Sequence, residues 1–130
     1  MAKTIHWPLQ FKYDVLAEGT ENFYVAFRIG RLYYDNRYWA PDEIVDIRVN
    51  HNIIRKGRVV GDLKLCTIAE INAEDFARLK PSLQNESDLI AFLSETYQQP
   101  VTQETLVTMV TYQNLALTAE NVDVNDDPHL

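Results

Sequence analysis

The stretch that decides the fold is Phe23-Tyr-Val-Ala-Phe-Arg-Ile29, which is rich in aromatic and β-branched side chains. Such residues favour a pleated, half-buried strand over a helix. Strand alternation divides the stretch into two faces, Phe23, Val25 and Phe27 against Tyr24, Ala26 and Arg28. The first face is a candidate core face. The second is either further core or one wall of a ligand site.

Downstream of this strand the pattern predicts more β-structure. Gly30-Arg31 is typical of a tight hairpin, which would lead into a second strand over 32–39. After a loop at Pro41-Asp42, residues 43–49 alternate as a strand should. Three further features are expected before residue 72: a turn at 55–57, one bent strand or two over 59–71, and a bulge at Gly61.

The remaining elements are helices followed by one more strand. Asn72 is a candidate N-cap of a helix that Pro81 ends, and residues 86–97 carry an apolar stripe of Leu89, Ile90, Leu93 and Tyr97. Residues 105–112 alternate as a last strand, whereas residues 11–19 fit a helix and a strand equally well. This order predicts an α+β fold, either a small mixed β-sheet or a partly closed β-barrel, flanked by two or three short helices.

Length and composition indicate one domain with an acidic tail. A chain of 130 residues with 46% hydrophobic residues can bury one sizeable core. We assign residues 1–115 to that domain and residues 116–130, including His129, to a disordered acidic tail. No apolar run approaches the roughly 20 residues of a membrane span, so no membrane partner is expected. A single cysteine, Cys66, is consistent with a reducing cytoplasm.

The formal net charge of −7 is unevenly distributed along the chain. Residues 28–64 carry eight basic and five acidic groups, net +3, whereas residues 65–115 carry two basic and seven acidic groups, net −5. The overall charge argues against a general nucleic-acid binder. The basic middle third either forms solvated strand faces or surrounds an anion, and the acidic helical section is a candidate surface for a basic protein partner.

Common catalytic and cofactor motifs are absent from the sequence. The four glycines are too dispersed for a phosphate-binding loop, and the histidines and Cys66 lack the short spacing of a metal site. We therefore predict no cofactor and no metal. Cys66, between Leu65 and Thr67 in a strand-like run, is interpreted as a buried, unreactive thiol, and a nucleophile–base pair with His51 would require the fold to bring the two together.

Aromatic residues are concentrated in one segment. Seven of the fourteen aromatic residues lie between Phe23 and Trp39, with arginines interleaved. Rings combined with guanidinium groups can stack a base and contact a phosphate, although aromatic-rich strands also form ordinary cores. The candidate ligand-binding residues are Tyr24, Arg28, Arg31, Arg37, Trp39 and Lys56.

Three stretches resemble ASCH domains, members of the PUA-like superfamily. Residues 11–28 resemble the opening helix, glycine and first strand, residues 39–47 resemble the entry to the next strand, and residues 58–71 resemble the strand that precedes the helices. The resemblance implies a PUA-like β-barrel with a cleft that binds RNA, nucleotides or modified nucleosides. Some ASCH proteins are amidohydrolases of acetylated cytidine that use a lysine, a threonine and a glutamate.

The catalytic residues of that family do not carry over to this chain. Glu21 stands where the family has lysine, Tyr24 and Ala26 occupy the strand positions where a glutamate is needed, and Pro41 replaces the usual glycine. Only Arg28, as the strand arginine at a cleft wall, transfers. We therefore predict a non-catalytic binding module for structured RNA or a nucleotide-like small ligand. The alternatives are a protein-interaction module and a hydrolase of modified nucleosides, and the oligomeric state stays open.

Overall fold

The computed structural model describes residues 2–116 and shows an α+β fold. Its strands are β1 (Thr4–Trp7), β2 (Phe23–Ile29), β3 (Ile44–Val49), β4 (Asn52–Val59), β5 (Lys64–Thr67) and β6 (Leu106–Asn114). Its helices are α1 (Lys12–Ala17), α2 (Leu32–Asp35), α3 (Ala73–Ala77) and α4 (Glu86–Tyr97), and its 3-10 turns are η1 (Leu9–Phe11), η2 (Ile68–Glu70) and η3 (Pro81–Leu83). The predicted tail, apart from Ala116, lies outside the described residues.

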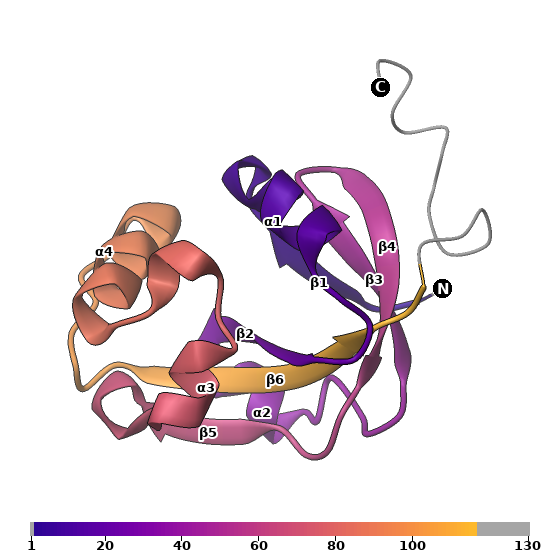
Figure 1. Cartoon of the computed structure of the whole chain (residues 1–130). Helices are drawn as coiled ribbons and strands as arrows, with labels where there is room; N and C mark the ends of the chain where they lie inside the picture. The colour runs from indigo at the N-terminus through magenta and orange to yellow at the C-terminus, as the bar shows by residue number, and fades with distance from the viewer. Residues whose placement is uncertain (1, 117–130) are drawn as a thin grey trace.

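The six strands form one mixed sheet in the order β1-β3-β4-β6-β2, and β5 also pairs with β6 (Figure 1). The β1–β3 pair is parallel and the other pairs are antiparallel. Over the described residues no ladder joins β1 to β2, so the sheet is not closed into a barrel. Of the two architectures that the sequence predicts, the mixed sheet is therefore the one that the chain adopts.

Several predicted elements are confirmed. The stretch over 23–29 is β2, the alternating stretch over 43–49 contains β3, and the last strand is β6. The predicted N-cap Asn72 acts through its side chain, to which the Asp75 backbone N–H donates. Asn85, for which no cap is predicted, caps α4 in the same way by accepting from the Asp88 backbone N–H. Residues 11–19, for which a helix and a strand were both possible, begin at the end of η1 and then form α1.

The predicted hairpin at Gly30-Arg31 is wrong. The chain turns at Gly30, where φ is +87°, but residues 32–35 then form α2 instead of a returning strand. An ion pair between Arg31 and Asp35, four residues apart, supports this short helix. The partner of β2 is β6, with Ala26 opposite Val110, so a distant strand takes the place of the local one.

The predicted turn at 55–57 is also wrong, because these residues lie inside β4. The chain turns earlier, at Asn50, which has a left-handed φ of 58°. Gly57 is instead required by close packing. A Cβ atom built on it would lie 3.3 Å from the Gln113 carbonyl oxygen and 3.3 Å from Ile47 Cδ1. Gly61, predicted as a bulge, has φ +70° in the bend that follows β4, and the register irregularity lies at Ile47/Arg48.

A buried polar cluster connects α1 to β6. The Lys80 ammonium group is paired with the Glu18 carboxylate, and it also donates to the Tyr112 hydroxyl. Asn114 donates to the same carboxylate. Arg55 donates to the carbonyl oxygens of Val15, Glu18 and Leu115. The cluster therefore satisfies groups at the end of α1, the helix that follows β1 and η1.

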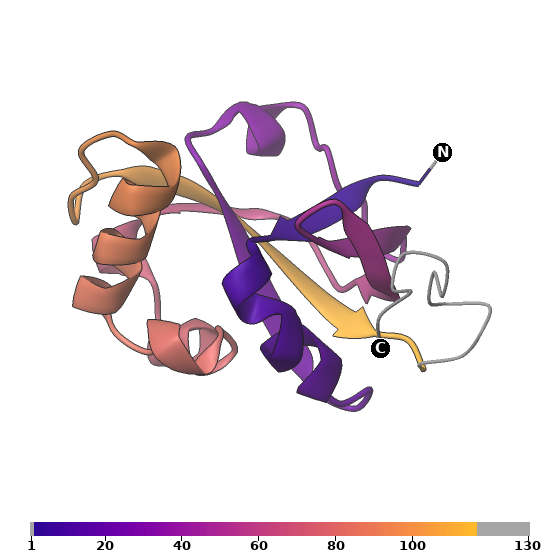
Figure 2. The ribbon, with the colours of Figure 1, turned by 90° about the horizontal axis from the view of Figure 1, so that it is seen from above.

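Helix α1 and the pair α3 and α4 form two separate groups along β6. Figures 1 and 2 show α1 near β1 and β4, whereas α4 with α3 lies toward the other end of β6. Buried residues from both groups, such as Val15 and Leu93, belong to the same hydrophobic core as the buried residues of the strands. Among residues 2–116, no helix combines the length and apolar character needed to cross a membrane.

Candidate functional site

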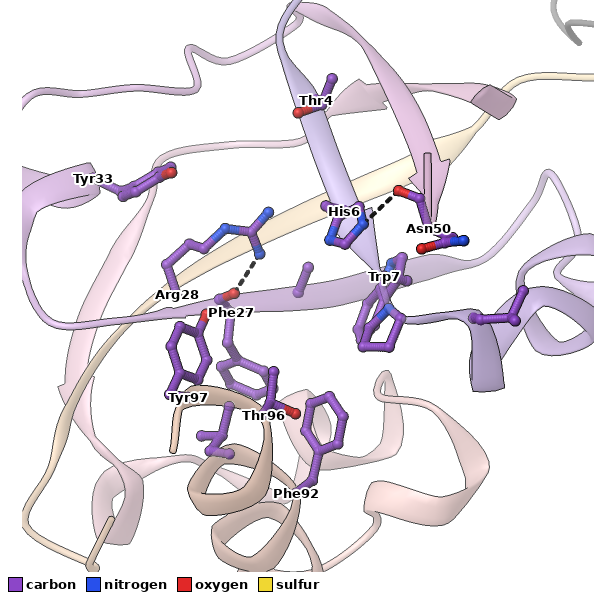
Figure 3. A pocket seen from close by; sticks show the side chains of 14 residues that line it. Thr4, His6, Trp7, Phe27, Arg28, Tyr33, Asn50, Phe92, Thr96 and Tyr97 are labelled. Atoms are coloured by element: carbon purple, nitrogen blue, oxygen red, sulfur yellow. Dashed lines mark hydrogen bonds between the residues drawn. The ribbon is translucent and has the colours of Figure 1, made fainter. Parts of the chain in front are cut away.

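A cavity of about 570 Å³ lies between the free edges of β1 and β2, with the C-terminal half of α4 on one side (Figure 3). Its volume falls within the range of small-molecule sites, roughly 300–1,000 Å³. It is lined by Thr4, His6, Trp7, Pro8, Leu9, Ala26, Phe27, Arg28, Tyr33, Asn50, Phe92, Leu93, Thr96 and Tyr97. The cavity thus occupies the gap that strand pairing between β1 and β2 would have closed.

Aromatic rings form its rigid apolar side. Trp7 contacts Phe11 edge to face at 5.4 Å between centroids, and Phe11 contacts Phe92 in the same manner at 5.2 Å. This chain of rings connects β1, η1 and α4, and the edge-to-face arrangement is the one that aromatic quadrupoles prefer. The apolar stripe predicted on α4 therefore packs into the core through Leu93 and also places Tyr97 at the cavity.

Arg28 is held in place on the opposite side of the cavity. Its Nη1 donates to the Phe27 carbonyl oxygen at 2.6 Å. Its guanidinium carbon lies 5.7 Å from the Tyr33 ring centroid and 5.4 Å from that of Trp39, within reach of cation–π attraction. Figure 3 shows the guanidinium group turned toward His6 across the cavity. The side chain is therefore preorganised, with donors on Nε and Nη2 available to a ligand.

The cavity is electropositive although the chain is acidic. Among the described lining residues, Arg28 is the only side chain with a formal charge at neutral pH, and none is a carboxylate. Over residues 2–116, Arg28 forms no ion pair, whereas Arg31, Lys56, Lys64, Arg78 and Lys80 each pair with an acidic group. The Arg28 charge is thus not neutralised locally, and a bound anion would be attracted to it.

His6 faces Arg28 from the edge of β1. Its Nε2 lies 2.7 Å from the Asn50 carbonyl oxygen. A carbonyl oxygen can only accept, so Nε2 is the donor and carries the proton. The proton-free nitrogen of the neutral ring is then Nδ1, which Figure 3 shows on the side of the ring away from Asn50.

The structure does not gather the six candidate residues at one site. Arg28 lines the main cavity. Arg31 is exposed at the position just before α2 and is paired with Asp35, and Lys56 on β4 is paired with Asp46 at 3.1 Å. The remaining three are Tyr24, Arg37 and Trp39.

Tyr24 lies toward the other end of β2, where its hydroxyl accepts a hydrogen bond from the Gly19 backbone N–H. Trp39 is buried. It contacts Arg28 through its ring and donates from Nε1 to the Thr4 carbonyl oxygen. It also lines a separate cavity of about 220 Å³ together with Arg37. Trp39 therefore packs against the Arg28 guanidinium and helps to fix its position. Arg37 lines the separate cavity and not the main one.

Sequence reasoning missed several residues of the main cavity. The sequence presents His6 only as a possible metal ligand, and it gives no signal for Asn50 or Thr96. Tyr97 does have a sequence signal, because a tyrosine that ends an apolar stripe has a polar group to place at the edge of the core. The proximity of β1 to β2 could not be seen in the sequence, because it depends on how segments far apart in the chain pack together.

Cys66 lies on β5, outside this cavity. Burial, reinforced by the nearby Glu70 and Asp75, raises the pKa of its thiol, so the sulfur stays protonated at neutral pH. Within residues 2–116, no group of three or more histidine, cysteine or acidic side chains is arranged to hold a metal ion.

Comparisons with protein-family models, with curated proteins and with solved structures found no match. The resemblance to ASCH domains therefore stays a prediction.

Proposed function

We propose that the chain is a non-catalytic binding module and that its main cavity takes a nucleotide-like small ligand. The observation that carries this proposal is the Arg28 guanidinium, preorganised and without an ion-pair partner, at the edge of an aromatic cavity that no described carboxylate lines. A planar ring would pack among Trp7, Phe92 and Tyr97, and an anionic group would bind Arg28.

The lining favours binding over catalysis. Among the described lining residues there is no cysteine, serine, lysine, aspartate or glutamate to act as a nucleophile or a carboxylate base. The Nε2 of His6 is already engaged by a backbone carbonyl. What the lining offers is hydrogen-bond donors, aromatic faces and one positive charge, which suit recognition of a ring and an anion.

The test is isothermal titration of the full chain with adenosine 5′-monophosphate (AMP) and with adenosine, repeated for Arg28→Gln. Glutamine keeps a donor but removes the charge and the guanidinium fork. We expect wild type to bind AMP more tightly than adenosine, and Arg28→Gln to weaken AMP binding by about tenfold or more, because a charge-assisted hydrogen bond is worth roughly 1.5–3 kcal/mol.

Arg31→Gln is the matched control, because it removes the same charge from the residue just before α2, outside the cavity. We expect its AMP affinity to equal that of wild type. Equal losses in the two variants would mean that only the general charge matters. Absence of AMP and adenosine binding by wild type would refute the proposed function.

A further inference from the structure

Two nitrogen-bearing side chains from opposite free edges of the sheet face the same part of the cavity. Arg28 extends from β2 and His6 from β1, and both line the cavity (Figure 3). Each is oriented by a backbone carbonyl, that of Phe27 for the guanidinium and that of Asn50 for the imidazole. Neither orienting bond uses His6 Nδ1 or Arg28 Nη2, so these two nitrogens stay available.

We propose that a phosphate monoester group of the ligand binds between Arg28 and His6, and that the imidazole takes up a proton at Nδ1 when it does. This inference rests on the proposed function and specifies its anionic subsite. Donors that approach from two sides fit a tetrahedral oxyanion, whose oxygens point in different directions, better than a carboxylate, whose two oxygens lie in one plane.

The proton follows from the tautomer of His6. With Nε2–H donating to Asn50, the neutral ring presents only an acceptor at Nδ1. A phosphate oxygen is also an acceptor, so the two would repel each other. Protonation of Nδ1 turns this nitrogen into a donor and adds a second positive charge opposite the dianion.

The surroundings of His6 agree with this assignment. Two arginines face His6: Arg28 from β2, and Arg48, which is the register partner of His6 on β3. The titratable groups that face it are Tyr33 from α2 and Tyr97 from α4. None is a carboxylate, and Asp46, on the same face of β3, is paired with Lys56. A bound phosphate would thus supply the negative charge that favours the imidazolium form.

The experiment measures the dissociation constant of AMP for wild type and His6→Gln between pH 6 and pH 8.5. The ratio of the two constants isolates His6, because the titration of AMP itself is common to both proteins. We expect His6→Gln to bind AMP about tenfold more weakly than wild type near pH 6, with a ratio close to one at pH 8.5. By reciprocity, AMP should move the NMR titration midpoint of His6 upward.

The controls separate the possible causes. His51→Gln changes a histidine in the β3–β4 turn, outside the cavity lining, and should leave AMP affinity unchanged at every pH. Adenosine lacks the phosphate, so the ratio of its dissociation constants for His6→Gln and wild type should not vary with pH. Inorganic phosphate is a separate probe of the subsite. It should bind more weakly than AMP, and its ratio of dissociation constants should show the same dependence on pH, because the subsite contacts only the phosphate group.

The outcomes distinguish this inference from the proposed function. AMP binding with a ratio that is constant from pH 6 to pH 8.5 overturns the role of His6 and leaves the proposed function standing. Tight adenosine binding without a preference for AMP overturns the phosphate subsite in the same way. If wild type binds neither AMP nor adenosine, the proposed function and this inference fail together.

Discussion

Lys80 illustrates how a single residue can connect distant parts of this chain. Its side chain is fully buried, pairs with Glu18 and lies 3.8 Å from the centroid of the Trp7 ring. Burial lowers the pKa of Lys80, and the charge of Glu18 partly offsets this effect. Because Trp7 lines the main cavity, the ion pair beneath it also supports the cavity wall.

Tyr112 belongs to the same cluster and makes its pH dependence testable. Burial, with Glu18 next to the hydroxyl, raises the pKa of Tyr112 well above its usual value of 10.0. Above pH 10 the unfolded chain loses this proton while the folded chain keeps it, so the unfolded state binds fewer protons and stability falls as pH rises. Burial lowers the pKa of Lys80, so just below pH 10.5 the unfolded state binds more protons at this residue, and its contribution to stability rises with pH.

We therefore expect the difference in stability between wild type and Tyr112→Phe to become smaller above pH 10. Near pH 8 the variant should be less stable by about 1 kcal/mol, because the buried hydroxyl contacts are lost. Phenylalanine cannot ionise, so the difference should shrink between pH 10 and pH 11. Urea denaturation at a series of pH values measures it. A difference that stays constant from pH 8 to pH 11 would contradict the assignment.

At the scale of elements, β4 shows how packing overrides a local turn signal. Gly57 pairs with Val45 on one side and Asn114 on the other, so it sits where β3 and β6 both join the strand. In the neighbouring Arg55, the guanidinium group is buried among the carbonyl oxygens that it holds. Basic residues next to a glycine are typical of an exposed turn, but here Arg55, Lys56 and Gly57 lie within the strand β4.

We expect Gly57→Ala to destabilise the protein by about 1–3 kcal/mol, because the added methyl group would overpack a site with neighbours at 3.3 Å. Gly19→Ala is the matched control. Its nearest neighbour, Asn22 Nδ2, lies 3.9 Å from the added atom, and the effect should stay within roughly 0.5 kcal/mol. Chemical denaturation followed by circular dichroism compares the two. Equal stability changes would mean that close packing at β4 is not the reason for Gly57.

At the scale of the whole molecule, the net charge of −7 and the electropositive cavity act against each other. The field of the whole chain repels a polyanion, whereas the cavity attracts a single anionic group at short range. A small ligand that enters the cavity experiences mainly the local charge. A polynucleotide would also extend along surfaces that include the acidic helical section.

We therefore expect single-stranded RNA to bind weakly, with a dissociation constant above about 100 µM at 150 mM salt. Fluorescence anisotropy with a labelled twelve-nucleotide RNA measures this affinity, and AMP titration under the same conditions is the comparison. Micromolar RNA binding that weakens steeply with salt would instead indicate an extended basic surface and would favour RNA as the partner.

The sequence by itself determined the elements whose signals are local. Alternation predicts β2, β3 and β6, and the cap at Asn72 and the apolar stripe on α4 predict the helices, because these features depend on neighbours within a few residues. It also offered Arg28 as a ligand-binding candidate, because arginines interleave with the aromatic residues between Phe23 and Trp39, and the resemblance to ASCH domains implied that Arg28 lies at a cleft wall.

Only the tertiary structure decided which strands pair and which residues meet. β2 pairs with β6 rather than with a hairpin partner, and Gly57 lies in a strand rather than in a turn. Arg28 and His6 line one cavity, whereas Arg28 and Arg37 line different ones. The physical reason is that pairing and cavity formation depend on contacts between segments far apart in the chain, whose burial energy outweighs local preference and leaves no periodic trace in the sequence.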